Sequence, residues 1–268
     1  MSRVPRRVAR PVLRGPRRGN APGLPGDAVE AARAAQSGRA AGAPKGRDGA
    51  VEAIRALMVA TRSARSERTQ AINQARSLIV TGPEELRARF ARHSPARLVA
   101  ELAALRPRPG DVPGYATRVA LRELGRRARF LEAQTGQLDE LIVPLVTARA
   151  PGLLALHGVG ADTAARLLIA AGDHPARLRS EAAWAHLCGT APIPASSGKV
   201  TRWRLNRGGD RDANHALWRI VICRMKSHPA TRAYVARRSK EGLSKKEIIR
   251  CLKRYVAREV YPYLRDAR

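Results

Sequence analysis

Apolar runs in this sequence are short, and this absence sets the first limit on what the chain does. A membrane-spanning helix needs about 18 or more consecutive apolar residues, and no segment of the 268 residues comes near that length. The arginine-rich beginning leads into proline and glycine, so no secretory signal peptide is predicted. We therefore expect a cytoplasmic protein without a membrane partner.

Cysteine and histidine are also scarce, and their spacing excludes the common metal sites. The three cysteines, Cys188, Cys223 and Cys251, are far apart and form no Cys-x-x-Cys pair, so neither a zinc ribbon nor a disulfide framework is predicted. We expect them to be small core residues in a reducing compartment. No two of the six histidines have the spacing of metal ligands, and no glycine-rich Walker loop supports nucleotide hydrolysis.

Acidic residues are few relative to basic ones. The chain has 51 lysines and arginines against 22 aspartates and glutamates, a formal net charge of +29. A positive field of this size favours a polyanionic partner, DNA or RNA. A ribosome-associated or chromatin-like basic protein would share this charge. At 268 residues the chain is long enough to bury a sizeable core and to form two domains.

Residues 184–225 combine turn residues, serines and cations more densely than any other stretch. Two prolines hold the backbone extended before the turn, and Gly198 permits a sharp reversal. Ser196 and Ser197 are therefore predicted at the tip of a loop. Residues 199–205 follow as a short strand or hairpin arm, and a turn leads to Asp210, which is predicted to cap a helix.

Basic side chains follow the two serines closely. They are Lys199, Arg202, Arg204, Arg207 and Arg211. Guanidinium groups hold a phosphodiester through paired hydrogen bonds, and a serine hydroxyl beside them is placed to attack phosphorus. The alternative is that the serines form only a turn and that the basic residues form only a surface that faces nucleic acid.

Two runs of sequence carry a resemblance to a known family. They are CGTAPIPASSGKVTRWRLNRGGDRDANHALWRI, which starts at Cys188, and TRAYVARRSKEGLSKKEIIRCLKRYVAREVY, which starts at Thr231. They resemble the C-terminal domain of the bridge-RNA-guided insertion-sequence transposases of the IS-one-ten family. The resemblance implies that Ser197 is a nucleophile that forms a covalent serine–DNA phosphate, with Ser196 as the second choice.

The same resemblance implies a metal-dependent acidic domain ahead of residue 48. Family members have an RNase-H-like domain with four acidic residues that bind Mg²⁺. Here Asp27 matches one of them, Leu24 stands where another is expected, and the strands that carry the other two have no counterpart. One carboxylate cannot hold the metal, so Asp27 is a remnant ligand and the chain is interpreted as truncated at its N-terminus. The family also implies a structured guide RNA and assembly into dimers or tetramers.

The chain in order suggests four regions. Residues 1–26 are predicted to be a disordered basic leader, because arginine, proline and glycine dominate them. Residues 27–47 form the remnant helix of the acidic domain. Residues 48–150 form a coiled-coil arm, and residues 151–268 form the C-terminal transposase domain.

Two long helices are predicted in the arm, one from residues 48 to 80 and a second that includes residues 121–145. The second has a heptad pattern at Leu121, Leu124, Ala128, Leu131, Thr135, Leu138, Ile142 and Leu145. Pairing within the chain and pairing between two copies fit this pattern equally well. In the first helix Arg62, Arg65 and Arg68 form a basic stripe, which either contacts a phosphate backbone or is simply solvated.

Residues 153–168 have the pattern of a helix-hairpin-helix. In this motif Gly158, Val159 and Gly160 would let backbone N–H groups at a helix N-terminus approach a DNA phosphate, whereas the alternative is a tight helix connection. Ser180 and Ser244 are predicted to cap two further helices. The last helix has a basic face that either binds nucleic acid or is solvated.

Together these patterns predict a mainly α protein with a long-helix arm, a compact helical C-terminal domain and a small β element. We expect an insertion-sequence transposase that binds, cleaves and joins DNA in the nucleoid, with activity compromised by the missing acidic domain. The alternatives are a non-catalytic DNA- or RNA-binding remnant and a general basic protein, which explains the charge but not the serine loop.

Overall fold

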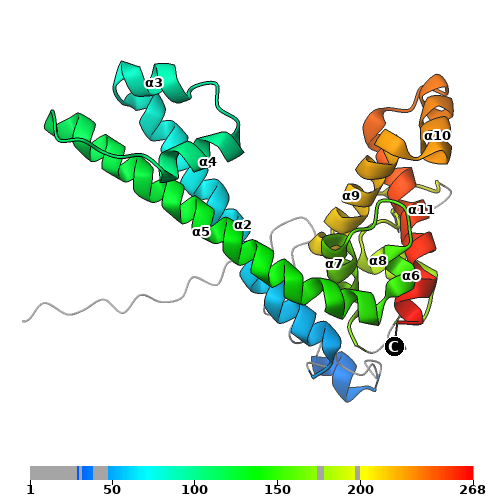
Figure 1. The fold of residues 1–268 in the computed structure, drawn as a ribbon. Helices are drawn as coiled ribbons and strands as arrows, with labels where there is room; N and C mark the ends of the chain where they lie inside the picture. The colour runs from blue at the N-terminus through cyan, green and yellow to red at the C-terminus, as the bar shows by residue number, and fades with distance from the viewer. Residues whose placement is uncertain (1–28, 30–31, 39–47, 174–177, 197–199, 268) are drawn as a thin grey trace, which may run out of the picture.

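The computed structural model describes residues 29, 32–38, 48–173, 178–196 and 200–267. The predicted leader 1–26, Asp27, Ser197, Gly198 and Lys199 lie outside these residues. The described chain is mainly helical with one small two-stranded sheet, as predicted (Figure 1). Its helices are α2 Ala50–Thr81, α3 Glu84–Phe90, α4 Pro95–Ala103, α5 Val112–Arg149, α6 Pro151–Leu154, α7 Ala161–Ala171, α8 Glu181–Leu187, α9 Arg211–Ser227, α10 Pro229–Lys240 and α11 Lys245–Arg265. The strands are β1 Ile193–Pro194 and β2 Trp203–Arg204.

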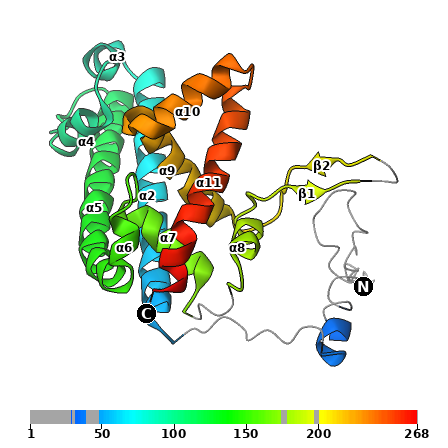
Figure 2. The same cartoon turned by 90° about the vertical axis from the view of Figure 1, so that its right-hand side faces the viewer.

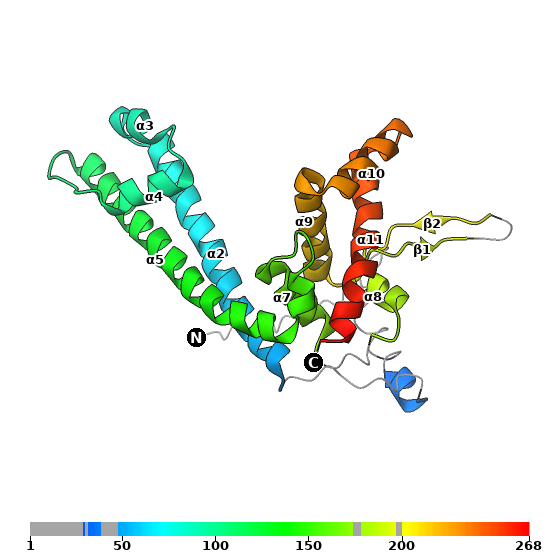
Figure 3. The same ribbon diagram turned by 45° about the vertical axis from the view of Figure 1, so that its right-hand side comes forward.

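Helices α2 and α5 run in opposite directions along each other and form a two-helix arm, with α3 and α4 at its far end (Figure 3). All eight positions of the heptad pattern predicted in α5 are buried or half-buried. Their partner helix is α2 of the same chain, which buries Ile54, Met58, Ile72 and Ile79 in return. The predicted helix and its apolar face are therefore confirmed, with pairing inside the chain.

The basic stripe on α2 has a role that neither interpretation of the sequence anticipated. Arg62 pairs with Asp212, Arg65 pairs with Asp139 and Asp162, and Arg68 pairs with Glu132. These carboxylates lie on α9, α5 and α7. The stripe is therefore neither free to contact phosphate nor merely solvated, because its charges join α2 to three neighbouring helices.

One hydrophobic core joins the base of the arm to the C-terminal helices. Its centre includes Trp184, Leu217 and Ile220, none of which exposes measurable surface. Ile54 of α2 and Val146 of α5 belong to the same cluster, so the arm is anchored in this core. Helix α7 packs against both arm helices, and α9 and α11 pack in turn on α7 (Figure 3). Burying each large apolar side chain contributes about 1.5–3 kcal/mol relative to leaving it exposed.

Side-chain caps fix the starts of several helices. The hydroxyls of Ser180 and Ser244 and the carboxylate of Asp210 accept backbone N–H groups in the first turns of α8, α11 and α9, as predicted. Ser244 and Glu247 form the complete reciprocal capping box. Each such cap stabilises its helix by about 1 kcal/mol. These local bonds explain why the helix starts were predictable.

The cysteines follow the prediction only in part. Cys188 is fully buried in the core, and burial, helped by the nearby charge of Asp210, raises the pKa of its thiol. Cys223 is exposed, so the prediction of a core position is wrong for it. The reason is that Ile220, Val221 and Arg224 define the inward face of α9, and position 223 falls beside that face. Among the described residues no helix is long and apolar enough to cross a membrane.

Candidate functional site

A direct backbone contact between the end of α8 and the start of α9 anchors the predicted serine loop to the C-terminal domain. Gly209 has φ +88°, and a Cβ placed on it would lie 2.5 Å from the carbonyl oxygen of Leu187. The adjacent Asp210 N–H donates to the same Leu187 carbonyl at 2.6 Å. The end of α8 and the start of α9 are thus in direct backbone contact, which only glycine at position 209 allows.

Two asparagine side chains complete this fastening. Asn206 donates to the His186 carbonyl at 3.2 Å, and Asn214 donates to the Cys188 carbonyl at 2.7 Å. The Asn214 side-chain oxygen in turn accepts from Lys253 of α11 at 2.9 Å. We call this set of contacts the hairpin clamp. Residues 206–210 are therefore more than the turn that their composition predicted.

The clamp holds a short antiparallel hairpin that projects from the body of the protein (Figure 2). Ile193 pairs with Arg204, Pro194 pairs with Trp203, and the Ala195 N–H donates to the Arg202 carbonyl at 2.8 Å. At the tip, the Ser196 hydroxyl accepts the Arg202 N–H at 3.2 Å. The predicted small β element therefore exists, and it includes β1 ahead of the predicted strand.

The predicted phosphate-binding arginines lie on this hairpin and in the segment that follows it. Arg202, Arg204, Arg207 and Arg211 are all exposed. In the described part of the chain none of their side chains takes part in a hydrogen bond or an ion pair, whereas the arginines on α2 and α7 that face the arm are paired with carboxylates. Trp203 is 62% exposed and Leu205 is 50% exposed on the same hairpin. The hairpin thus presents free cations beside exposed apolar surface.

The glycines of the predicted helix-hairpin-helix face in different directions. A Cβ on Gly158, which has φ +80°, would meet Cys223 and Ile220 of α9 at 3.3 Å, and Val159 is buried. The His157 carbonyl accepts from the buried Arg224 at 2.7 Å. Gly160 alone has open space around it. The turn between α6 and α7 is therefore fixed on α9, with its outermost glycine open.

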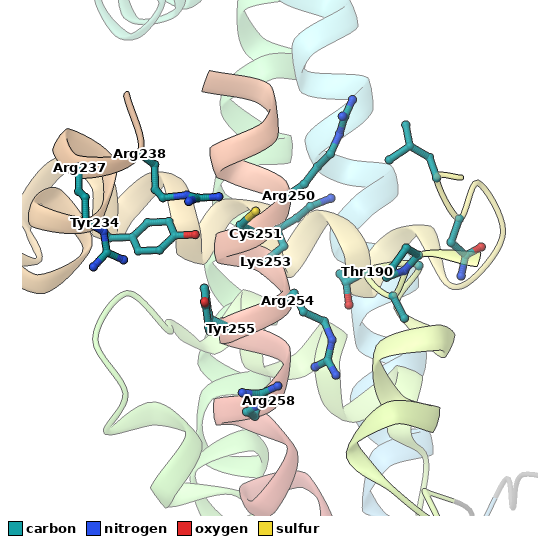
Figure 4. Close-up of a pocket in the computed structure, with 15 residues that line it drawn as sticks. Thr190, Tyr234, Arg237, Arg238, Arg250, Cys251, Lys253, Arg254, Tyr255 and Arg258 are labelled. Atoms are coloured by element: carbon teal, nitrogen blue, oxygen red, sulfur yellow. The ribbon is translucent and has the colours of Figure 1, made fainter. Parts of the chain in front are cut away.

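A basic groove of about 620 Å³ lies between the hairpin base, α10 and α11. Figure 4 shows Tyr234, Arg237 and Arg238 coming from α10 on one side and Thr190 from the hairpin base on the other. Six cations line it: Arg237, Arg238, Arg250, Lys253, Arg254 and Arg258. The sequence indicated the basic face of the last helix but missed α10, because only the tertiary structure brings the two helices together.

Burial and mutual repulsion act on the cations of this groove. Burial first, and the charge of Arg250 second, lower the pKa of Lys253 below its ordinary value. Burial and the neighbouring Arg258 likewise lower the pKa of Arg254. In each case the smaller cause is a neighbouring positive charge, which an anionic ligand would offset.

The described residues do not fit a catalytic metal ion. No group of three or more histidine, cysteine, aspartate or glutamate side chains among them is arranged to hold one. Three aspartates near the arm already form ion pairs with arginines: Asp139, Asp162 and Asp212. The predicted remnant ligand Asp27 lies outside the described residues.

One segment of the chain matches a known protein family. Residues 150–236, which span the α6–α7 turn, the hairpin, the clamp except Lys253, and α9, match the Transposase IS116/IS110/IS902 family. Among individual proteins, the chain is 33% identical over 156 residues to a 43.6 kDa protein of insertion element IS110 from Streptomyces coelicolor, an alignment that covers 58% of this chain and 36% of the relative. It is 27% identical over 187 residues to a 42 kDa protein of insertion element IS900 from Mycobacterium paratuberculosis, covering 68% of this chain and 46% of that protein. The chain therefore spans less than half the length of these curated relatives.

Proposed function

We propose that this chain acts in DNA transposition as the serine-bearing part of an insertion-sequence transposase. The proposal rests on the family match over residues 150–236 and on the relatives encoded by insertion elements. In this role it binds DNA, cleaves a phosphodiester and transfers the strand, in the cytoplasmic nucleoid. The match covers the segment that carries the hairpin, so the hairpin is where the chemistry is proposed.

The main structural support for this proposal is the set of unpaired arginines on a hairpin that the clamp anchors. Arg202, Arg204 and Arg207 have no acidic partner in the described parts of the chain, although carboxylates pair with most arginines of the arm. A cation kept free of carboxylates retains its full capacity to bind phosphate. The clamp limits the motion of the hairpin, which favours catalysis because positioning lowers the entropic cost of reaction.

In the proposed reaction the Ser197 oxygen attacks a DNA phosphorus. The serine hydroxyl loses its proton, an oxygen–phosphorus bond forms, and the bond from phosphorus to the leaving DNA oxygen breaks as that oxygen takes up a proton. The product is a covalent serine–DNA phosphate that keeps the bond energy for joining to a second DNA end. Arg202, Arg204 and Arg207 would stabilise the charge that develops on the nonbridging oxygens.

The contacts of Ser196 support Ser197 as the nucleophile. The Ser196 hydroxyl oxygen accepts the backbone N–H of Arg202, so it contributes to closing the hairpin. A hydroxyl with this structural bond is less free to align with phosphorus. We therefore assign Ser196 to the hairpin and Ser197 to the chemistry.

Further parts of the proposal concern carboxylates, RNA and assembly. The Mg²⁺-binding carboxylates that the family requires are proposed to lie outside the described residues, which hold no such cluster. We propose that the net charge of +29 allows the chain to bind a structured guide RNA as well as DNA. Self-association is proposed through the outer face of α2.

A covalent-adduct assay tests the chemistry. The chain is incubated with branched element-end DNA, Mg²⁺ and co-purified RNA, and a denaturation-resistant protein–DNA band is sought. Ser197→Ala is expected to abolish the band while leaving DNA affinity unchanged. Ser196→Ala, the matched control, is expected to keep the band at reduced yield because only the hairpin is weakened.

A different outcome would favour a second function. If no adduct forms while tight DNA or RNA binding persists, the chain is a non-catalytic binding protein and the serine chemistry is wrong for it. The absence of a metal-holding cluster in the described ranges is the observation that keeps this alternative open. If Ser196→Ala alone removes the band, the two serines exchange roles.

A further inference from the structure

The basic groove beside the hairpin has a strong excess of positive charge. Within the described residues its lining includes six cations and no carboxylate. Two carboxylates just outside it form ion pairs with groove cations: Glu181 with Arg254, and Glu241 with Arg238. An excess of four positive charges remains. A concave surface with this balance is suited to a ligand that carries several negative charges.

The cations are arranged in a row along α11. Arg250, Arg254 and Arg258 recur every four residues, so they lie on one face about 6 Å apart along the helix axis. This distance is comparable to the step between phosphates of an extended polynucleotide strand. Arg250 makes no hydrogen bond or ion pair in the described chain. Arg258 lies 3.9 Å from Glu181, the carboxylate that also pairs with Arg254, and its side chain is still 63% exposed. The row therefore has an unpaired cation at one end and a largely exposed one at the other.

Tyrosines lie beside this row of charges. Tyr255 of α11 is 53% exposed, and its ring meets that of Tyr234 edge to face at 5.6 Å. The guanidinium of Arg237 lies 5.4 Å from the centre of the Tyr234 ring. Exposed aromatic faces next to a cationic track are typical of surfaces on which unpaired bases stack.

We propose that this groove binds a single-stranded nucleic-acid segment, with phosphates on Arg250 and Arg258 and an unpaired base on Tyr255. The aromatic component decides between one strand and two. The bases of a duplex are already stacked on one another, so Tyr255 would contribute nothing to duplex binding, whereas it provides a stacking surface for a free base. The site is separate from the chemistry of Ser197, and either proposal can fail without the other.

Fluorescence anisotropy with the full chain tests the groove. The probes are a short labelled DNA strand, the RNA strand of the same sequence and the corresponding DNA duplex. Arg250→Glu is expected to weaken single-strand binding by about tenfold or more. Arg232→Glu, the same charge change at an exposed position of α10 outside the groove, is expected to change it by less than about twofold. Arg250→Ala should make the dependence of log affinity on log salt less steep by about 0.7.

The tyrosine variants separate stacking from charge. Tyr255→Ala is expected to weaken single-strand binding by about fivefold or more and to leave duplex binding unchanged, whereas Tyr255→Phe keeps both. Equal losses from Arg250→Glu and Arg232→Glu would overturn the proposal, because bulk charge would then explain the binding. So would Tyr255→Ala having no effect, or having the same effect on the duplex. Comparing the DNA strand with the RNA strand identifies which of them the groove prefers.

Two cysteines of the chain locate the bound strand. Cys251 lines the groove, while the exposed Cys223 lies outside it on α9. The single strand is expected to slow alkylation of Cys251 by N-ethylmaleimide and to leave Cys223 unaffected. Protection of Cys223 in place of Cys251 would move the strand to another surface and contradict the proposal.

Discussion

Gly125 lies where α4 packs directly against the backbone of α5. A Cβ placed there would lie 2.6 Å from the Ala103 backbone nitrogen and 2.7 Å from the Leu102 Cβ. Gly136 lies further along the same helix, and nothing would lie within 4 Å of its Cβ. Close packing against α4 therefore requires glycine at position 125, whereas no contact requires it at position 136.

Alanine at these two positions is expected to act in opposite directions. Gly125→Ala should lower the free energy of unfolding by about 1–3 kcal/mol, because the backbone of α4 must move away. Gly136→Ala should raise it by about 0.5–1 kcal/mol, because alanine favours an exposed helix interior over glycine. Urea unfolding followed by circular dichroism measures both. Changes of the same sign would show that the close contact of α4 with α5 is not required.

The α3–α4 element at the end of the arm is organised by one carboxylate. Glu101 accepts hydrogen bonds from Arg97 at 2.9 Å and from Arg89 at 3.3 Å, and it pairs with His93 at 2.9 Å. The Arg97 bond first, and the His93 bond second, lower the pKa of Glu101 from 4.5 to about 2. The charged form of this side chain therefore stabilises the folded arm.

This shift predicts a specific part of the acid response. Because the folded-state pKa is depressed, the stabilisation is fully present above the unfolded value of 4.5 and is lost as pH falls towards about 2. Glu101→Gln should lower the melting temperature above pH 5 and flatten its decline between pH 4.5 and 2. Thermal unfolding across that range measures this. Glu140→Gln on α5, an exposed position, is the control and should keep the wild-type slope. A Glu101→Gln profile parallel to that of the wild type would contradict the assignment.

At the scale of the whole molecule, the arm and the C-terminal helices diverge from a shared base (Figure 3). The outer face of α2 carries exposed, uncharged residues at alternating steps of four and three: Val59, Ser63, Ser66, Gln70, Asn73, Ser77 and Val80. In a chain with 27% charged residues, this α2 stripe lacks the charges that keep helices apart. Its middle forms a shallow concave surface. These features support the proposed self-association.

Charges introduced into the α2 stripe should separate the copies. The double variant Gln70→Arg and Asn73→Arg is expected to reduce the molar mass measured by light scattering to that of one chain, because like charges would face each other across the interface. Gln134→Arg and Gln137→Arg add the same charge to exposed positions of α5 and should leave the mass unchanged. A loss of assembly in the α5 variant alone would place the interface on that helix.

The sequence by itself determined the elements of this protein. The heptad pattern of α5, the capping box at Ser244 and the cap at Asp210 depend on residues within a turn or two of one another. Short-range hydrogen bonds and helical periodicity are therefore sufficient to predict such features. The mainly helical class, the two long helices and the small β element followed from them.

The tertiary structure alone decided how the charges are used. Arg62 is paired with Asp212, which lies 150 positions away, whereas Arg202 and Arg250 have no carboxylate partner in the described chain. All three residues are arginines, and their neighbours along the sequence do not distinguish them. Which cation meets a carboxylate depends on how the helices pack around the shared core, and that packing is a long-range outcome of burying apolar surface. For the same reason the basic groove, built from α10, α11 and the clamped hairpin, could be found only in the folded chain.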